Sequence, residues 1–401
     1  MPKSVMSTPS ARIMNTYQRF PITLVKGKGS YVWDKNDTKY LDYTSGIATC
    51  NLGHVPDFVQ AKLHEQLDSL WHCSNLYEIP SQQALANILT ENSVSDQVFF
   101  CNSGAEANEA AIKLAKKYAK DQGHAERTEI VTFSDSFHGR TGTTLAATAQ
   151  TKIHEGFTPI TPGFRYLPFN HLESLTEVNN GKTTAVLLEL VQGEGGVRPA
   201  DPSWIQELAK ICKENDILFM VDEIQTGMGR TGTLFAYEQF NIEPDVITLA
   251  KGLGSGFPIG AMMAKEAVAN SFQPGTHGST FGGNPLATTA GLATIEALTS
   301  PDFLTTVTNK SAMLTKQLHQ LKEDFPSIVE VRGMGLLIGI EFTHPVKPIM
   351  ESLRAKKILV LIAGPKVLRI LPPLVTTTEE LELFMDELKH TIKAEEQGVT
   401  S

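Results

Sequence analysis

The sequence predicts an α/β fold with a mostly parallel central sheet in a large domain, plus a smaller α+β domain. Short runs that are apolar on both faces recur through the middle of the chain, and helical stretches separate them. This alternation is typical of parallel strands covered by helices on both faces. The strands are expected at residues 97–100, 129–133, 185–188, 217–221 and 246–250.

A hairpin is predicted near the N-terminus, after a polar arm. Residues 31–34 and 39–42 flank the turn-rich residues 35–38. Beyond about residue 290 a helical stretch is followed by expected strands at 328–331, 336–340 and 358–361. A final helix begins at a capping box formed by Thr377 and Glu380, because apolar residues follow it at helical spacing.

These patterns divide the chain into three parts. Residues 1–54 form an N-terminal arm and hairpin that belong to the small domain. Residues 55–290 form the large, ligand-binding domain, and residues 291–401 form the C-terminal small domain. A chain of 401 residues buries enough surface to fold without a disulfide or metal.

The composition excludes several classes of protein. A net charge of −9 argues against nucleic-acid binding, for which a basic domain is typical. No apolar run approaches the ~18 residues of a membrane span, and the N-terminus has no secretory signal. The four cysteines, at 50, 73, 101 and 212, form no CxxC pair, so we expect reduced thiols in a cytoplasmic protein.

Ligands of open parallel sheets bind at the carboxyl ends of the strands. After the first predicted strand, Asn102, Ser103, Gly104 and Ala105 lead into an alanine-rich helix. Free N–H groups and the helix dipole make this turn an anion site. Alone, the same residues fit a tight turn in which Asn102 or Ser103 is the N-cap.

The next strand ends offer an aromatic ring and charges. Phe137 suits stacking on a planar ring and Arg140 suits a carboxylate, whereas His138 is interpreted as a structural histidine with satisfied hydrogen bonds. Glu194 stands between glycines, which let backbone approach a ligand. The competing interpretations are a core phenylalanine, a surface arginine and a solvated loop glutamate.

Two charged residues close apolar runs. Asp222 ends one run, where a carboxylate is costly unless a cation meets it, and its neighbour Glu223 is expected to face solvent. Lys251 follows the last run, where burial lowers a lysine pKa and frees the amine as a nucleophile. Residues 227–232 match G-x-G-x-x-G but are interpreted as a loop, because the acidic pair would repel a pyrophosphate. The histidines and cysteines have no metal-ligand spacing, so no metal is expected.

An anion cradle, an aromatic face, a carboxylate and a buried lysine together fit one cofactor. Pyridoxal 5′-phosphate has a phosphate, a flat ring, a ring nitrogen that must stay protonated, and an aldehyde that takes a lysine as a Schiff base. Asp222 would pair with the ring nitrogen, and Lys251 would carry the cofactor and shuttle the proton.

The sequence resembles the class III pyridoxal-phosphate aminotransferases over nearly its whole length. Six motifs carry the resemblance: Asn102-Ser103-Gly104-Ala105-Glu106-Ala107, Phe137-His138-Gly139-Arg140, Gln192-Gly193-Glu194-Gly195-Gly196, Asp222-Glu223-Ile224-Gln225-Thr226-Gly227, Leu249-Ala250-Lys251-Gly252 and Thr280-Phe281-Gly282-Gly283-Asn284-Pro285. Within the class, residues 277–287 and 364–369 are most similar to the acetylornithine aminotransferases.

The resemblance implies fold type I, which is the aspartate aminotransferase-like fold, and a homodimer with shared sites. It assigns the cofactor phosphate to the turn at Ser103, Gly104 and Ala105, with Phe137 stacked on the ring. By the same resemblance, Gln225 reaches the ring hydroxyl. Thr280 reaches the phosphate of the partner subunit's cofactor, and Ser279 lies near that subunit's substrate.

The resemblance also implies the substrates. N2-acetylornithine would give its ω-amino group to 2-oxoglutarate in two half-reactions, as in arginine biosynthesis. Arg140 would bind the α-carboxylate of acetylornithine and the side-chain carboxylate of glutamate. Arg369 would bind the α-carboxylate of glutamate, and Glu194 would neutralise Arg369 when the ω-amino substrate is present.

Ile47 bears on the choice among related substrates. Ornithine aminotransferases have a tyrosine at the matching position, and isoleucine there fits an acylated amine better. Ornithine, succinylornithine and 4-aminobutyrate aminotransferases remain alternatives, as does a racemase or aminomutase of the same fold. The isomerases need no second carboxylate clamp, so Arg140, Glu194 and Arg369 argue against them.

Overall fold

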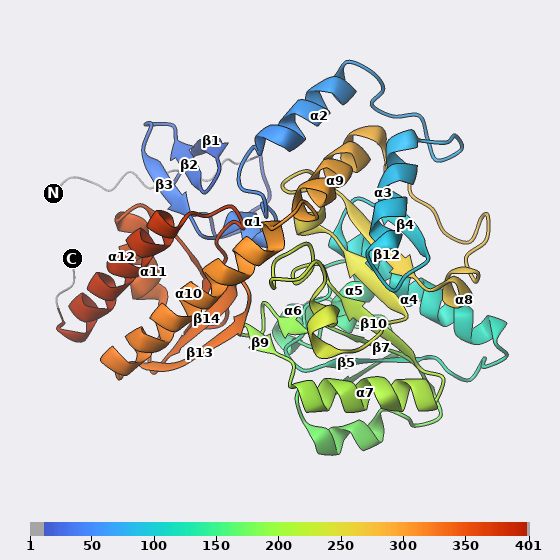
Figure 1. The fold of residues 1–401 in the computed structure, drawn as a ribbon. Helices are drawn as coiled ribbons and strands as arrows, with labels where there is room; N and C mark the ends of the chain where they lie inside the picture. The colour runs from blue at the N-terminus through green and yellow to red at the C-terminus, as the bar shows by residue number, and fades with distance from the viewer. Residues whose placement is uncertain (1–11, 399–401) are drawn as a thin grey trace.

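The computed structural model describes residues 12–398 and places a seven-stranded sheet at the centre of the larger lobe (Figure 1). All five predicted strands are present in it, and neighbouring ones pair in parallel except around β12. In spatial order the strands are β4 (Gln97–Cys101), β12 (Gly260–Ala264), β11 (Val246–Leu249), β10 (Leu218–Asp222), β7 (Thr183–Leu188), β5 (Glu129–Phe133) and β6 (Phe164–Leu167).

The two faces of this sheet pack on different helices. In β7, Ala185 and Leu187 face the core made with α4 (Gly104–Asp121), whereas Val186 and Leu188 face the core made with α7 (Pro202–Glu214). Both faces are therefore dry, which explains why the strands are apolar throughout. A fold of this kind leaves the carboxyl ends of the parallel strands as the place where polar side chains meet a ligand.

Further helices surround the sheet. No helix within residues 12–398 is long and apolar enough to cross a membrane. The pairs α2–α9 and α3–α9 pack together at the upper edge in Figure 1. The remaining helices are α1 (Ser45–Ala48), α2 (Asp57–Leu67), α3 (Pro80–Glu91), α5 (Gly142–Ala147), α6 (Thr151–His154), α8 (Glu266–Ala269), α9 (Pro285–Leu298), α10 (Phe303–Asp324), α11 (Lys347–Ala355) and α12 (Thr378–Glu396).

Two four-stranded sheets form the smaller lobe, on the left in Figure 1. The predicted hairpin is confirmed as β2 (Tyr31–Asp34) and β3 (Lys39–Asp42), with β1 (Leu24–Lys28) beside it. The second sheet contains β13 (Ile328–Met334), β14 (Leu337–Phe342), β17 (Val367–Ile370) and β16 (Leu361–Ile362). The capping box at the start of α12 is confirmed, since the Thr377 hydroxyl accepts from the backbone N–H of Glu380.

The prediction of one strand over 358–361 is wrong. The segment divides at Val360, so that β15 (Ile358–Leu359) pairs in parallel with β3, while β16 pairs with β17. One apolar run thus serves two sheets, and periodicity alone does not show such a division. The division into residues 1–54, 55–290 and 291–401 stays a prediction, which the pairing of β15 with β3 supports.

Candidate active site

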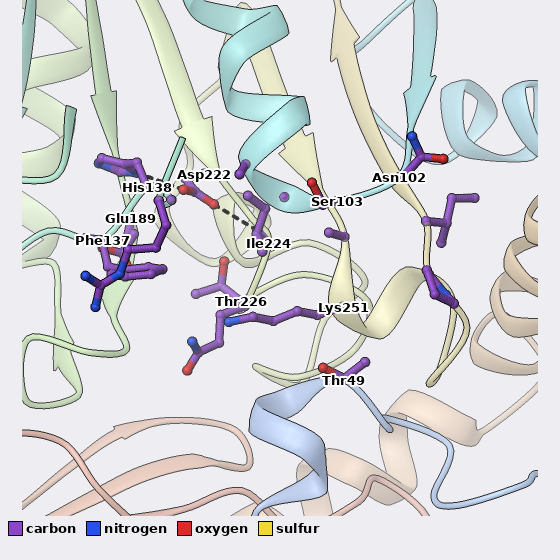
Figure 2. Close-up of a pocket in the computed structure, with 18 of the residues that line it drawn as sticks. Thr49, Asn102, Ser103, Phe137, His138, Glu189, Asp222, Ile224, Thr226 and Lys251 are labelled. Carbon is purple, nitrogen blue, oxygen red and sulfur yellow. Dashed lines mark hydrogen bonds and ion pairs between the residues drawn. The ribbon is translucent and has the colours of Figure 1, made fainter. Parts of the chain in front are cut away.

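A cavity of about 420 Å³ lies at the carboxyl edge of the large sheet. Figure 2 shows its walls, to which the ends of β4, β5, β10 and β11 contribute side chains. Sequence reasoning named eight of the lining residues as candidates: Ser103, Gly104, Ala105, Phe137, Arg140, Asp222, Gln225 and Lys251. Residues from four separate segments therefore lie together at the carboxyl ends of the strands, as the sequence predicted.

The turn after β4 forms an anion cradle. Ser103 is the N-cap of α4, and its hydroxyl accepts from the Glu106 backbone N–H at 3.3 Å. Within the described chain, the amides of Gly104 and Ala105 donate to no other group, so they are free for a ligand. A Cβ on Gly104 would lie 2.8 Å from Ile224 Cδ1, so any larger residue would displace the Ile224 side chain. Free amides at a helix start are the donors that a phosphate requires.

Asp222, labelled in Figure 2, ends β10 with its carboxylate buried and held on both oxygens. Its Oδ2 accepts from Asn108 Nδ2 at 2.8 Å and lies 2.8 Å from His138 Nδ1, and its Oδ1 accepts from the Ile224 N–H. The side-chain oxygen of Asn108, Oδ1, in turn accepts from the Thr248 hydroxyl at 2.7 Å. This network fixes the orientation of a carboxylate that faces the cavity.

His138 corrects one interpretation. The imidazole is buried as a structural histidine would be, but it contacts Asp222, and its Nε2 has no hydrogen-bond partner within residues 12–398. It therefore belongs to the site rather than to a satisfied core. Asn108 was not predicted either. Asn108 lies on α4 one turn after the cradle, so helical spacing could have placed it on the same side of the helix as the cradle.

The expectation that Glu223 faces solvent is wrong. Its side chain is buried and accepts from the Thr226 hydroxyl at 2.6 Å and the Tyr237 N–H at 2.9 Å, while burial raises its pKa to about 7. Residues 227–232 do form a loop, as predicted. Arg230 of that loop is fully buried and donates to Asn51 Oδ1 at 2.7 Å and Leu336 O at 3.2 Å. The glycine-rich loop thus joins the N-terminal and C-terminal segments to the large sheet.

Lys251 follows β11, separated from it by Ala250, and lines the cavity. In Figure 2 its side chain extends toward Thr226. Burial lowers the Lys251 pKa, although Glu194 opposes that shift. Its backbone has a φ of +41°, which is strained for a residue with a side chain, and such strain gathers at functional sites.

Phe137 and Arg140 form one wall of the cavity. The Arg140 guanidinium lies over the Phe137 ring, 5.5 Å from its centroid. The Phe137 N–H donates to Glu189 Oε1 at 2.8 Å, and the other carboxylate oxygen of Glu189 accepts from the Gly193 N–H at 3.2 Å. Burial raises the Glu189 pKa to about 7. Glu189 was not predicted, although it follows an apolar strand just as Asp222 ends one.

Glu194 and Arg369 form an ion pair. Arg369 Nη1 donates to Glu194 Oε1 at 2.5 Å and to the Gly193 carbonyl at 2.9 Å, and its Nε has no partner in the part of the chain that the structure describes. Burial would raise the Glu194 pKa, but Arg369, Lys251 and Gln225 together lower it. Gln225 lies on the cavity wall.

Five predicted residues lie outside the cavity wall: Glu194 and Arg369 of the ion pair, and also Ser279, Thr280 and Ile47. Ser279 accepts from Asn102 Nδ2 at 3.3 Å, and Thr280 is exposed. Ile47 is 46% exposed and belongs to α1, whose four residues all have left-handed φ values between 46° and 64°. One chain therefore does not bring Thr280 or Ile47 together with Lys251. Thr49, which follows α1, does line the cavity.

The site geometry agrees with comparisons to known proteins. The family model for the class III aminotransferases matches residues 13–392. The chain belongs to the class III aminotransferases. It is 65% identical over 380 residues to an acetylornithine aminotransferase of Oceanobacillus iheyensis, covering 95% of each chain.

Solved structures of class III aminotransferases have the same fold. An N-acetylornithine aminotransferase from Stenotrophomonas maltophilia superposes with a TM-score of 0.84 at 38% identity, over 95% of this chain and 98% of that one. An ornithine aminotransferase from Toxoplasma gondii gives a TM-score of 0.93 at 30% identity, over 96% of this chain and 94% of that one. The predicted fold type I and aminotransferase class are confirmed.

Proposed function

We propose that this enzyme transfers the ω-amino group of N2-acetylornithine to 2-oxoglutarate with pyridoxal 5′-phosphate as cofactor. One observation carries the proposal: the Glu194–Arg369 ion pair lies beside Lys251. An enzyme that uses one substrate without a carboxylate near the reacting amine, and another with one, needs an arginine that can be neutralised. The acetylornithine aminotransferases that resemble the chain at 45–65% identity support the acetylated substrate.

The residues of the cavity fit the cofactor. The free amides of Gly104 and Ala105 suit its phosphate, and Phe137 suits its ring. Asp222 suits the ring nitrogen, because a buried carboxylate accepts the N–H of a pyridinium and keeps it protonated. Gln225 is the proposed partner of the ring hydroxyl, and Lys251 of the aldehyde.

The reaction divides among these side chains. When bound, pyridoxal phosphate supplies an aldehyde that receives the amino group and a ring that withdraws electrons. Lys251 takes a proton at Nζ and returns it, which its lowered pKa favours because the neutral amine is the base. Asn108 and His138 hold Asp222 Oδ2, so the carboxylate keeps its orientation without rearranging during the reaction.

Substrate selection rests on the two arginines. Arg140, on the cavity wall, would bind the carboxylate of acetylornithine that lies away from the reacting amine. While acetylornithine is bound, Glu194 stays on Arg369. Glutamate brings its own α-carboxylate, and Glu194 then leaves. Ile47 would give an apolar wall to the acylated amine.

We also propose a homodimer and a cytoplasmic location. Thr280 and Ser279 lie outside the cavity wall of their own chain, which suits a role in the site of a partner subunit. Thr280 would reach the phosphate in that site, and Ser279 would lie near the substrate. The four cysteines are free, as in a reducing compartment.

The decisive experiment is a substrate panel. The purified enzyme is assayed with 2-oxoglutarate and acetylornithine, ornithine, succinylornithine or 4-aminobutyrate, and kcat/KM is compared. Acetylornithine is expected to have the highest value. A higher value for another amine would move the proposal to that substrate, and racemisation without amino transfer would overturn it.

A further inference from the structure

The loop that carries Glu194 is gripped by an arginine from the C-terminal sheet. Residues 193–197 connect β8 (Val191–Gln192) to β9 (Arg198–Pro199). Arg332 of β13 donates to the Gly196 carbonyl from Nε at 2.9 Å and from Nη2 at 2.7 Å, and to the Val197 carbonyl at 3.2 Å. Three hydrogen bonds from one planar guanidinium fix this end of the loop.

Arg332 is itself held on its other side. Its Nη1 donates to Glu341 at 2.5 Å and to Glu330 at 2.6 Å, and the Arg332 side chain is 10% exposed. Glu341 is the more buried partner, at 29% exposed against 53% for Glu330. The two carboxylates neutralise Arg332 and orient its fork, so its free edge is directed at the loop carbonyls.

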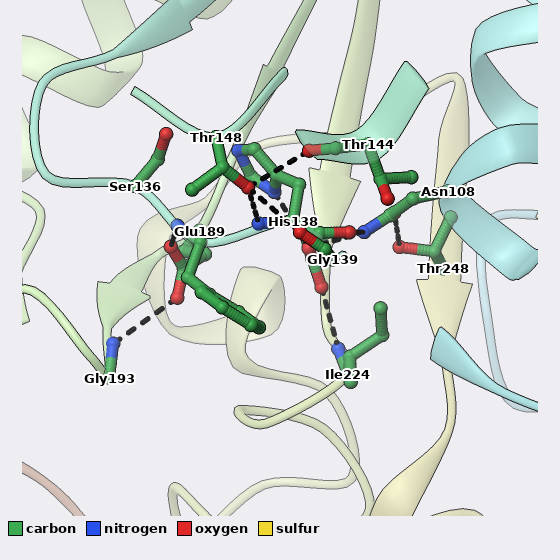
Figure 3. Close-up of polar contacts among 12 residues, drawn as sticks. Asn108, Ser136, His138, Gly139, Thr144, Thr148, Glu189, Gly193, Ile224 and Thr248 are labelled. Atoms are coloured by element: carbon green, nitrogen blue, oxygen red, sulfur yellow. Dashed lines mark hydrogen bonds and ion pairs between the residues drawn. The ribbon is translucent and has the colours of Figure 1, made fainter. Parts of the chain in front are cut away.

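The opposite end of the loop is held by Glu189 of the large domain and by Arg369 of the C-terminal sheet. The buried Glu189 accepts from the Gly193 N–H, as Figure 3 shows, and Arg369 donates to the Gly193 carbonyl. Neighbouring atoms leave no space around the glycines: a Cβ on Gly193 would lie 2.3 Å from Gln225 Oε1, and one on Gly195 2.7 Å from the Asp135 carbonyl. The backbone is fixed, and the Glu194 side chain is the part that can move.

We propose that Arg332 is a positioning residue that sets how firmly Glu194 occupies Arg369, and so sets the balance between the two substrates. The proposal rests on the proposed function of the Glu194–Arg369 pair. Arg332 touches neither substrate nor cofactor site. It acts by holding the loop from which Glu194 reaches Arg369, and a looser loop would release Arg369 to bind a second carboxylate more readily.

Two dead-end ligands test the proposal by binding alone. Glutarate has two carboxylates and pentanoate has one, and neither has an amine to transfer, so calorimetry on the holoenzyme measures how available Arg369 is. Arg332→Gln is expected to raise the affinity for glutarate relative to pentanoate by about tenfold, equivalent to ~1.4 kcal/mol. In the same variant, kcat/KM for the ω-amino substrate should fall relative to that for glutamate.

Matched variants separate positioning from general damage. Glu330→Gln removes the charge of the more exposed partner and should change the ratio much less than Arg332→Gln, because Glu341 still orients the guanidinium. Arg332→Lys, which keeps the charge, should give an intermediate ratio. In the Glu194→Gln background, Arg332→Gln should have no further effect. Thermal unfolding of each variant shows whether it is folded, and if Arg332→Gln does not fold, Arg332→Lys carries the test.

The outcomes test the positioning role of Arg332 separately from the proposed function of the Glu194–Arg369 pair. If Glu194→Gln raises the affinity for glutarate relative to pentanoate and the Arg332 variants do not, the positioning role is overturned. The proposed release of Arg369 by Glu194 then still stands. If Glu194→Gln also leaves the ratio unchanged, that release itself is wrong. An Arg332 effect that persists undiminished without the Glu194 carboxylate would mean that Arg332 acts by another route.

Discussion

Gly104→Ala should weaken cofactor binding through a steric effect that can be traced to one neighbour. The added Cβ would lie 2.8 Å from Ile224 Cδ1 and 2.9 Å from Ile224 Cγ2, whereas carbon atoms pack at ~3.5–4.0 Å. Ile224 donates its N–H to Asp222 Oδ1, so moving it disturbs the carboxylate as well as the start of α4. Overpacking of this kind costs about 1–3 kcal/mol.

This cost translates into a measurable loss of affinity. If the strain falls on the bound state, the dissociation constant for pyridoxal phosphate should rise roughly 5- to 150-fold, measured by fluorescence titration of the apo-protein. Ile224→Ala makes space for the new methyl group, so the Gly104→Ala/Ile224→Ala double variant should bind more tightly than Gly104→Ala. Wild-type affinity in Gly104→Ala, or a double variant no better than the single one, would refute the reasoning.

Four further predictions concern the proposed roles. Lys251→Ala should bind pyridoxal phosphate without covalent attachment and lose transamination; attachment of the cofactor by borohydride at another lysine, with activity intact, would falsify the assignment. Asp222→Ala should stay folded by circular dichroism yet lose most of its rate, and an active variant would mean that another group contacts the ring nitrogen. Mixing Lys251→Ala with Thr280→Arg subunits should restore some activity, because some mixed dimers have one intact site; no recovery, with subunit exchange confirmed, argues against shared sites. Ile47→Tyr should raise the kcat/KM ratio of ornithine to acetylornithine by ~10-fold, since a hydroxyl partner recovers ~1.4 kcal/mol, and an unchanged ratio would place discrimination elsewhere.

The sequence predicts those parts of the fold in which a local pattern of residues is compatible with only one structure. Strands apolar on both faces, such as β7, and the capping box at Thr377 are of this kind. β12 has no such signal, because it consists of Gly, Ala and Met, none of which is enriched in strands. The run over 358–361 is apolar throughout, and nothing local indicates that its two halves join different sheets.

In the candidate site, too, some residues could be predicted from the sequence and others could not. Asp222 and Lys251 were predicted because a charge at the end of a buried strand is costly without a function. Glu223 follows Asp222 and is also buried, since backbone N–H groups and a hydroxyl from residues 226–237 satisfy it. Such partners come from a loop whose path the sequence does not specify. The contact between His138 and Asp222 likewise depends on how β5 and β10 lie in the sheet.

The parallel pairing of β3 with β15 has a consequence for synthesis on the ribosome. Leu41 pairs with Ile358, so β3 is synthesised early in translation and its partner β15 only near the end. Until then β3 presents an unpaired edge, which can associate with other chains. The whole large sheet, from β4 to β12, emerges in the interval and is free to fold first. The smaller lobe is therefore completed only near the end of synthesis, although its hairpin is made at the start.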